Sequence, residues 1–275
     1  MDDQRCVRFL QWALPLLRKR WPGFRKVRKQ VCKRLQRRID ELGLVDVQAY
    51  RRHLQDHADE WSTLDHLCRV TVSRFYRDKV VLQHLSADVL PELARGAVAR
   101  GDNALRGWSA GCAMGEEAYT LVLIWNNVLQ ADFSELGIEV VGSDIDDQLL
   151  RRARRACYSY SSVKALPEDW LRSDFLLQQQ EYCLSPRVHS KVTFIRGDMR
   201  NLQNLGCFDL VLCRNIAFTY FEESLQLAIL NYIGEGLVEG GALIIGGHEA
   251  LPDGYGGFEP WSTHKAIFRK TGLSG

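Results

Sequence analysis

Short apolar segments alternate with amphipathic ones in the second half of the chain, and this alternation constrains the fold more than any other feature. The segments LRGWSA, IEVVGSDI, KVTFIRG, FDLVLCRN and ALIIGG have the length and composition of buried strands. Helical patterns at 116–129, 147–157 and 222–237 follow the first, second and fourth of these segments. Such an order is typical of a parallel sheet with helices on both faces. The sequence therefore predicts a doubly wound α/β domain.

The rest of the chain divides around this domain. Residues 1–90 contain few glycines or prolines and repeat apolar side chains at helical spacing, which predicts a small all-helical N-terminal domain with a linker helix. Residues 91–275 then form the α/β domain. Within it, the alternation is interrupted at 158–191 by a stretch too long for a simple connection, and we expect a small inserted subdomain there.

A strongly basic segment lies in the N-terminal domain. Positions 18–38 hold eleven Lys or Arg and no acid, although the net charge of the whole chain is only +2. Apolar residues recur through the segment at spacings of three and four, which predicts an amphipathic helix with a basic outer face. This face is either merely solvated or attracts an acidic protein surface or a nucleic-acid backbone. The recurring apolar residues are Phe24, Val27, Val31, Leu35, Ile39 and Leu42.

Composition bounds the class of protein. No apolar run approaches the ~20 residues that a membrane span requires, and the first residues lack the order of a signal peptide. These observations predict a cytoplasmic protein without a membrane span. The eight cysteines are scattered, with no C-x-x-C pair and no His at metal-ligand spacing, so we expect reduced thiols and no metal site.

Ligands of an open α/β sheet bind beyond the carboxyl ends of its strands, so the residues after each strand are the ones to inspect. The first strand is followed by a turn of small residues, Gly111, Ala113 and Gly115, which allows close approach of a ligand to the backbone. The turn ends in Glu116 and Glu117, which would repel a pyrophosphate. Two acids at this place favour a ligand that carries a positive charge.

Each of the next strands also ends in polar residues. Asp144 ends the second strand, where a carboxylate can accept hydrogen bonds from both ribose hydroxyls. Asp198 could accept from an adenine amine and Met199 could pack on the ring, while Arg214 and Asn215 follow the fourth strand. Together these strand ends indicate an adenosine-like ligand that carries an amino acid, which is S-adenosylmethionine.

Five stretches in order along the chain also resemble one family. They are VSRFYRD, WSAGCAMGEEAYTL, GSDIDDQLL, FDLVLCRNIAFTYF and GGALIIGGHEAL, and they are similar to the CheR-type protein-glutamate methyltransferases of bacterial chemotaxis. The resemblance implies a helical N-terminal domain joined to a Rossmann-like class I methyltransferase domain. It also implies S-adenosylmethionine as methyl donor and receptor carboxylates as acceptors.

The resemblance assigns roles to individual residues. Thr71, Ser73 and Arg77 match the family's donor-binding segment, and Arg77 would hold the methionine carboxylate or orient the acceptor. Glu116 and Glu117 would face the ammonium and sulfonium end of the donor. The family runs R-N-x-x-x-Y-F after the fourth strand, whereas this chain has one more residue before Tyr220. Arg77 and Tyr220 are therefore the catalytic candidates, and the remaining donor contacts are those at the strand ends.

Three functions remain open from the sequence. The first is methylation of carboxylates on an acidic protein, such as the cytoplasmic domain of a chemoreceptor that docks on the basic helix. The second keeps the fold and the donor but uses a small-molecule acceptor. The third is a binding module that senses the donor or holds nucleic acid without catalysis. Nucleic acid is the least favoured partner, because the donor-side residues are nearly all present.

Overall fold

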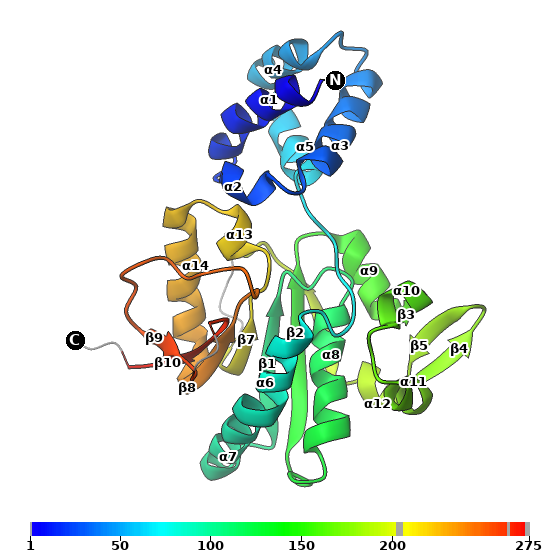
Figure 1. Ribbon diagram of the computed structural model, residues 1–275, viewed down its shortest axis with the longest axis vertical. Helices are drawn as coiled ribbons and strands as arrows, with labels where there is room; N and C mark the ends of the chain where they lie inside the picture. The colour runs from blue at the N-terminus through cyan, green and yellow to red at the C-terminus, as the bar shows by residue number, and fades with distance from the viewer. Residues whose placement is uncertain (1, 202–205, 263–264, 273–275) are drawn as a thin grey trace. The chain divides into compact units, whose positions relative to one another are not determined.

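The computed structural model describes residues 2–201, 206–262 and 265–272. The chain forms two compact units (Figure 1). Unit 1 consists of residues 1–71 and a distant segment, 219–226, and unit 2 consists of residues 72–218 and 227–275. The first stretch of unit 1 thus ends at residue 71, whereas the sequence predicted an N-terminal domain up to residue 90. Among the described residues, no helix is both long and apolar enough to cross a membrane.

Unit 1 is helical. Two of its helices begin at aspartates whose side chains accept from backbone N–H groups of the first turn, Asp2 for α1 and Asp46 for α4. The predicted basic helix is confirmed from Arg28 on as α3, with Val31, Leu35 and Ile39 buried in the core. The start of the basic segment differs, because Phe24 lies in the separate short helix α2 and residues 25–27 form a turn. The unit comprises α1 (Asp3–Leu16), α2 (Trp21–Phe24), α3 (Arg28–Glu41), α4 (Val47–Asp56) and α5 (Glu60–Leu67).

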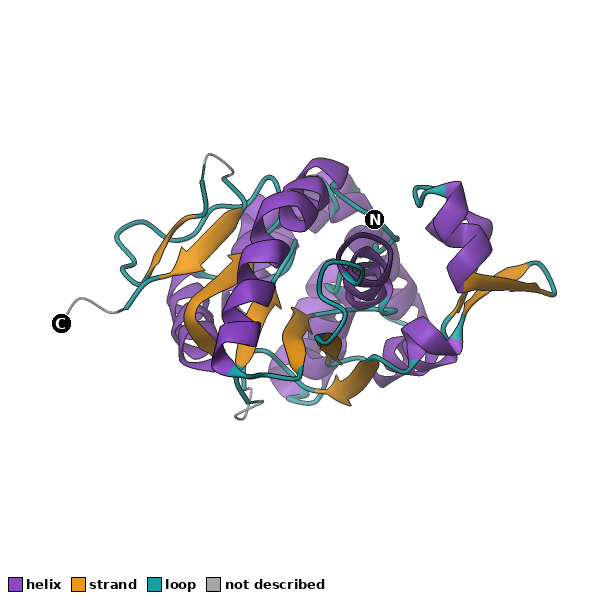
Figure 2. Cartoon of the chain, turned by 90° about the horizontal axis from the view of Figure 1, so that it is seen from below, coloured by secondary structure: helices purple, strands orange, loops and turns teal. Residues whose placement is uncertain are grey.

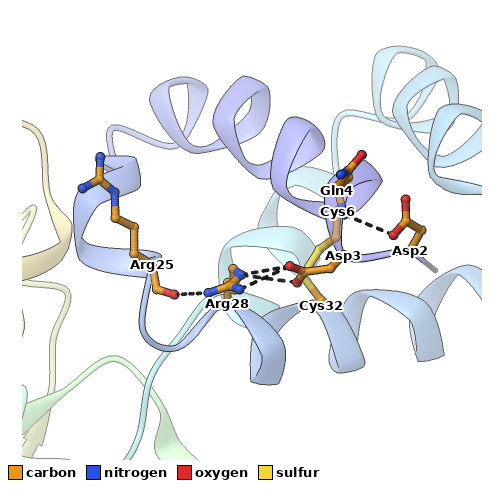
Figure 3. The surroundings of a disulfide bond; sticks show 7 residues. All are labelled: Asp2, Asp3, Gln4, Cys6, Arg25, Arg28 and Cys32. Carbon is orange, nitrogen blue, oxygen red and sulfur yellow. Dashed lines mark hydrogen bonds and ion pairs between the residues drawn. A yellow bond between two sulfur atoms is a disulfide. The ribbon is translucent and has the colours of Figure 1, made fainter.

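Two disulfides correct the expectation of reduced thiols. Cys6 of α1 is bonded to Cys32 of α3, beside the ion pair of Arg28 with Asp3 (Figure 3). A second disulfide joins two neighbouring strands of unit 2, at Cys157 and Cys183. Both pairs are 26 residues apart, and only helix packing or strand register brings them together. The free cysteines are Cys68, Cys112 and Cys213, all buried, and the exposed Cys207.

Loss of the Cys6–Cys32 disulfide is expected to destabilise unit 1. Closing a loop between cysteines 26 positions apart removes chain entropy from the unfolded state, worth about 3 kcal/mol. Cys6→Ser with Cys32→Ser should lower the free energy of unfolding by about that amount in denaturant titrations under oxidising conditions. The same double variant in dithiothreitol should match the reduced wild type, and a difference there would show that the serines act through packing.

Unit 2 is built on a seven-stranded sheet with the order β6-β2-β1-β7-β8-β10-β9, so the predicted α/β sheet is confirmed. Its first five strands are parallel, and β10 and β9 add antiparallel strands at one edge. From β1 the chain adds strands toward one edge of the sheet, and from β7 it adds them toward the other, so the strand order changes direction between β1 and β7. Open α/β sheets bind ligands at this point. The strands are β1 (Ala104–Ala110), β2 (Gly137–Asp144), β6 (Val192–Arg196), β7 (Phe208–Leu212), β8 (Leu237–Ile244), β9 (Phe258–Pro260) and β10 (Ile267–Lys270).

Helices connect and cover these strands. α7 packs on β1, β7 and β8, α8 packs on β1, β2 and β6, and α9 packs on β2 and β6. The side chain of Asp146 caps α9 by accepting from the N–H groups of Gln148 and Leu149. The helices are α6 (Lys79–His84), η1 (Leu85–Val89), α7 (Leu90–Arg100), α8 (Glu116–Ile124), η2 (Trp125–Leu129), α9 (Asp147–Arg155), α13 (Ala217–Tyr220) and α14 (Glu223–Gly236), and both α13 and α14 cross between the units.

The predicted insertion forms a second, three-stranded antiparallel sheet with the order β3-β5-β4. Figure 2 shows its strands as a group apart from the large sheet. The insertion comprises β3 (Cys157–Tyr158), α10 (Tyr160–Val163), α11 (Glu168–Asp174), β4 (Phe175–Gln178), β5 (Glu181–Leu184) and α12 (Pro186–His189).

Candidate donor-binding site

The turn after β1 has the backbone that its small residues allow. Gly111 and Gly115 have φ values of 70° and 86°, in the region that favours glycine. A Cβ at Gly115 would also lie 2.7 Å from Cζ of Phe194. Asp144, at the tip of β2, fixes this turn, because its Oδ2 accepts from the N–H of Ala113 at 3.0 Å. The turn and the predicted ribose-binding carboxylate are therefore one hydrogen-bonded assembly.

Glu116 begins α8 directly after this turn and is fully buried. Its Oε1 accepts from the hydroxyl of Ser162, in the inserted subdomain, at 3.2 Å. Burial raises the pKa of the Glu116 carboxyl above its ordinary value, and hydrogen bonds from Ser73 and Ser162 oppose that rise. The predicted residues Ser73 and Glu116 are thus brought together, whereas Ser162 was missed, because only the folded insertion brings it here.

Glu117, the next residue, faces a different partner. Its Oε2 accepts from Nη1 of Arg214 at 3.0 Å, and its Oε1 accepts from the hydroxyl of Ser109 at 2.9 Å. Arg214, after β7, also donates to Oδ2 of Asp78 at 2.6 Å. Sequence reasoning placed Glu117 and Arg214 at this edge but missed Asp78 and Ser109. Asp78 ends the quoted stretch VSRFYRD, which is the only signal that could have found it.

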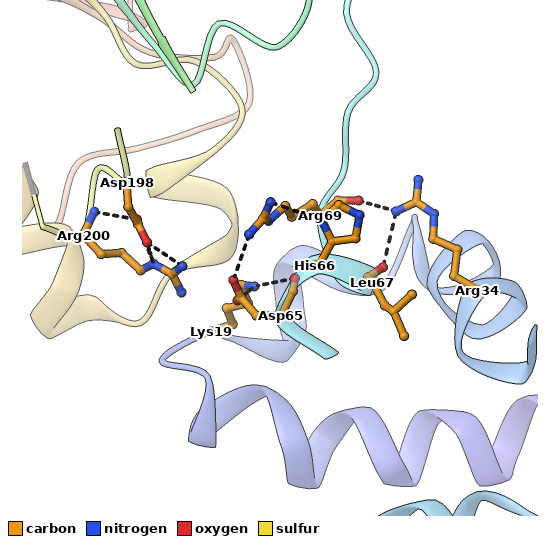
Figure 4. Close-up of polar contacts among 8 residues, drawn as sticks. All are labelled: Lys19, Arg34, Asp65, His66, Leu67, Arg69, Asp198 and Arg200. Carbon is orange, nitrogen blue, oxygen red and sulfur yellow. Dashed lines mark hydrogen bonds and ion pairs between the residues drawn. The ribbon is translucent and has the colours of Figure 1, made fainter. Parts of the chain in front are cut away.

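The residues after β6 form a local ion pair. Arg200 donates to both carboxylate oxygens of Asp198, with a shortest distance of 2.7 Å to Oδ2 (Figure 4). Met199, between them, is buried. Arg200 was missed by sequence reasoning and holds the carboxylate that we expected to meet an adenine amine. Any amine at Asp198 would therefore share this carboxylate with Arg200.

Asn215 and Arg77, two further predicted residues, have the following contacts. The backbone N–H of Asn215, with φ 58°, donates to Oε2 of Glu249 at 2.7 Å. Arg77 folds back on its own segment and donates from Nη1 to the carbonyl oxygen of Val72 at 2.9 Å. Thr71 is the last residue of the first stretch of unit 1. Its role in donor binding stays a prediction.

Tyr220 also belongs to unit 1. Its ring lies 5.0 Å from the ring of Phe24 in α2, measured between centroids, and its carbonyl oxygen accepts from the N–H of Arg20 at 2.9 Å. The ring of Tyr220 therefore packs against the helical core. Its role near the acceptor stays a prediction.

The residues at the carboxyl edge of the sheet fit a methyl donor that carries both a positively and a negatively charged group. Oε2 of Glu116 and Nε of Arg214 are buried and have no hydrogen-bond partner within the part of the chain that the structure describes. A buried polar atom without a partner costs about 1–3 kcal/mol. A ligand with cationic and anionic groups, as in the methionine part of S-adenosylmethionine, would pair both atoms.

A mostly parallel sheet with this strand order, a small-residue turn after β1 and an acid at the tip of β2 is typical of class I S-adenosylmethionine-dependent methyltransferases. Residues 71–267 match the family described as "CheR methyltransferase, SAM binding domain". The chain therefore belongs to the CheR methyltransferase family, and its methyl donor is S-adenosylmethionine.

Curated relatives agree with this family. Chemotaxis protein methyltransferase 2 of Vibrio cholerae is 30% identical, with 80% of this chain and 77% of that protein covered. A probable chemotaxis protein methyltransferase of Rhizobium etli is also 30% identical, over 80% of this chain and 84% of that protein. Chemotaxis protein methyltransferase 1 of Pseudomonas aeruginosa is 31% identical, over 66% of this chain and 68% of that protein.

Glu116→Gln is expected to stabilise the ligand-free protein at neutral and alkaline pH. Because the folded-state pKa of Glu116 is raised, its contribution to stability is present below the unfolded value of about 4.3 and is lost as pH rises through the folded value. Glutamine does not titrate, so the melting temperature of the variant should exceed that of the wild type at pH 8. The gain should shrink as pH falls toward 5.

Thermal unfolding between pH 5 and 8 measures this effect. Glu259→Gln is the matched control, because Glu259 is exposed on β9. Replacing this side chain by a neutral one is expected to leave the melting temperature unchanged. A Glu116→Gln variant that is less stable than wild type at pH 8 would contradict the assigned cause of the pKa shift.

Proposed function

We propose that this methyltransferase transfers the methyl group to glutamate carboxylates of an acidic protein, such as the cytoplasmic domain of a chemoreceptor. Support comes from the relatives named as chemotaxis protein methyltransferases and from the basic face of α3. The proposed compartment is the cytoplasm, because that is where such an acceptor domain lies.

One observation on α3 carries the choice of a protein acceptor. Arg28, Arg34 and Arg38 bond within unit 1, to Asp3, to the carbonyl oxygen of Leu67 and to Glu60 respectively. In contrast, three other cations of α3 are exposed and have no ion pair to any residue that the structure describes. These cations, Lys29, Lys33 and Arg37, are spaced by four residues and so form one stripe about 12 Å long. We name them the α3 stripe; it would match a row of acids on a helical partner.

The donor is proposed to lie at the carboxyl edge of the sheet in unit 2. The proposed contacts are the turn at Gly111, the acids Glu116, Glu117 and Asp144, and the side chains that follow β6 and β7. Arg77 and Ser73 would bind the methionine end from the segment before α6. Asp198, Met199, Arg214 and Asn215 complete the proposed set.

The chemistry needs no general base. A glutamate side chain has an ordinary pKa near ~4.3, so at neutral pH its carboxylate is already the nucleophile. When bound, S-adenosylmethionine supplies a methyl group on a positively charged sulfur. Transfer of this methyl group to the acceptor oxygen would break the carbon–sulfur bond, and the electron pair of that bond would remain on sulfur. The protein contributes alignment of the two reactants and a setting with little water.

Incubation with methyl-labelled donor and acidic receptor fragments tests the proposed function. The protein should label the fragments, and alkali should release the label, because carboxyl methyl esters are hydrolysed by base. Label that survives alkali, or turnover only on small acids from a protein-free extract, would contradict it. Asp144→Ala serves as the control for enzyme-dependent labelling.

Charge reversal of the α3 stripe is expected to impair acceptor binding specifically. Lys29→Glu, Lys33→Glu and Arg37→Glu together should raise the KM for the acidic fragment by about tenfold or more, with kcat and the donor KM nearly unchanged. Steady-state kinetics at low and high salt measure this effect. The matched control reverses three exposed arginines on other helices, Arg5, Arg8 and Arg52. Equal increases in both triple variants would indicate a non-specific effect of net charge.

A further inference from the structure

Asp78 is bonded to the candidate donor site through Arg214. Nη2 of Arg214 lies 2.6 Å from Oδ2 of Asp78 and also donates to the carbonyl oxygen of Arg77 at 2.9 Å. Nη1 of the same guanidinium holds Glu117 at 3.0 Å. The side chain of Arg214 is only 3% exposed. One buried guanidinium thus joins the segment before α6 to the first turn of α8.

The backbone of Asp78 fits this position. Asp78 has φ 61° and ψ 57° and stands immediately before α6. Among residues other than glycine, aspartate and asparagine adopt this left-handed conformation most readily. The conformation alone therefore admits asparagine as well as aspartate, whereas the contact with Arg214 calls for a carboxylate.

The charges of the cluster formed by Asp78, Arg214 and Glu117 do not cancel. Two carboxylates, on Asp78 and Glu117, share the single positive charge of Arg214, which leaves one net negative charge. The remaining partner of Glu117 is the neutral hydroxyl of Ser109. Without the carboxylate of Asp78, Glu117 and Arg214 would neutralise each other.

We propose that Asp78 is a positioning residue that shares the charge of Arg214 with Glu117 and thereby keeps the three side chains net negative toward a cationic donor. This inference rests on the proposed location of the donor at the carboxyl edge of the sheet. S-adenosylmethionine carries sulfonium and ammonium groups and one carboxylate, so its net charge is positive. The product S-adenosylhomocysteine lacks the sulfonium charge and is neutral overall. Loss of one negative charge from the cluster therefore weakens donor binding more than product binding.

Asp78→Asn isolates the charge, because asparagine has nearly the same shape and accepts the same backbone conformation. Calorimetry with the purified protein gives Kd for S-adenosylmethionine and for S-adenosylhomocysteine. The variant should bind the donor about tenfold more weakly, which is about 1.4 kcal/mol, and the product less than about threefold more weakly. Asp78→Glu should restore the wild-type ratio of the two Kd values, since it restores the charge. Asp102→Asn, which removes an exposed acid paired with Arg100, should leave the ratio unchanged.

A structural role alone gives a different result. If Asp78→Asn weakens both ligands equally, or changes neither, the charge proposal is overturned. If Asp78→Glu leaves the ratio as in Asp78→Asn, the proposal is overturned as well. Wild-type protein that binds neither ligand would instead overturn the donor-site proposal itself. Failure of the proposal for Asp78 can therefore be distinguished from failure of the proposed donor site.

Discussion

Replacing Arg214 by alanine is expected to lower the free energy of unfolding by about 3 kcal/mol and to reduce donor binding below detection. The variant leaves the carboxylates of Asp78 and Glu117 facing each other without their shared cation. Removal of one partner from a buried ion pair costs more than the pair contributes, because an uncompensated charge remains. The segment before α6 also loses the hydrogen bond to the carbonyl oxygen of Arg77.

Denaturant unfolding and calorimetry with S-adenosylmethionine measure the two effects of Arg214→Ala. Arg214→Lys should recover only part of the stability, because an ammonium cannot span both carboxylates and the carbonyl in the manner of a planar guanidinium. Arg172→Ala is the control, since Arg172 is 70% exposed and its surface pairs with Glu168 and Asp169 contribute little. Wild-type stability in Arg214→Ala would show that the cluster does not fix this part of the fold.

Gly23→Ala is expected to destabilise unit 1 by about 2–3 kcal/mol. A Cβ at this position would lie 2.1 Å from the carbonyl oxygen of Thr219, so backbone has to move. The contact holds segment 219–226 against the start of unit 1, where Glu222 pairs with Arg18 at 2.7 Å and Phe221 forms a β-bridge with Lys19. The ring of Tyr220 would lose its packing on Phe24 in the same displacement.

Thermal unfolding and methyl transfer to an acidic fragment test the Gly23→Ala prediction. Gly96→Ala is the matched control, because a Cβ there meets only the end of the Arg100 side chain, at 3.4 Å. Alanine inside a helix should leave the stability of this control unchanged or raise it by about 1 kcal/mol. A Gly23→Ala variant as stable as the control would show that segment 219–226 can shift without lowering the free energy of unfolding.

Local patterns made most of the α/β fold predictable. Strands β6 and β7 lie within apolar segments read from the sequence, and β1 and β2 each begin one residue before theirs, because burial on both faces leaves near-continuous apolar runs. β8 begins at Leu237, and only its last residues, from Ala242, fall in the predicted segment. The edge strands β9 and β10 have no such run and were not predicted. α3 was predictable because one of its faces is buried and periodic.

Contacts between distant residues could not be predicted in the same way. Nothing in the spacing of Cys6 and Cys32 distinguishes them from the cysteines that stay free. Asp78 and Ser162 contact candidate donor residues only through tertiary packing. The packing of Tyr220 on Phe24 likewise joins positions nearly two hundred residues apart.

The distant segment of unit 1 determines when that unit can be completed during synthesis. Domains usually fold in the order in which the ribosome releases them, beginning with the N-terminal one. Here residues 219–226 are part of the first unit. The helices of unit 1 can therefore form their contacts with this segment only after most of the chain has been synthesised. A ribosome-bound chain that ends before residue 219 should therefore leave α2 open to protease, whereas release past residue 226 should protect it.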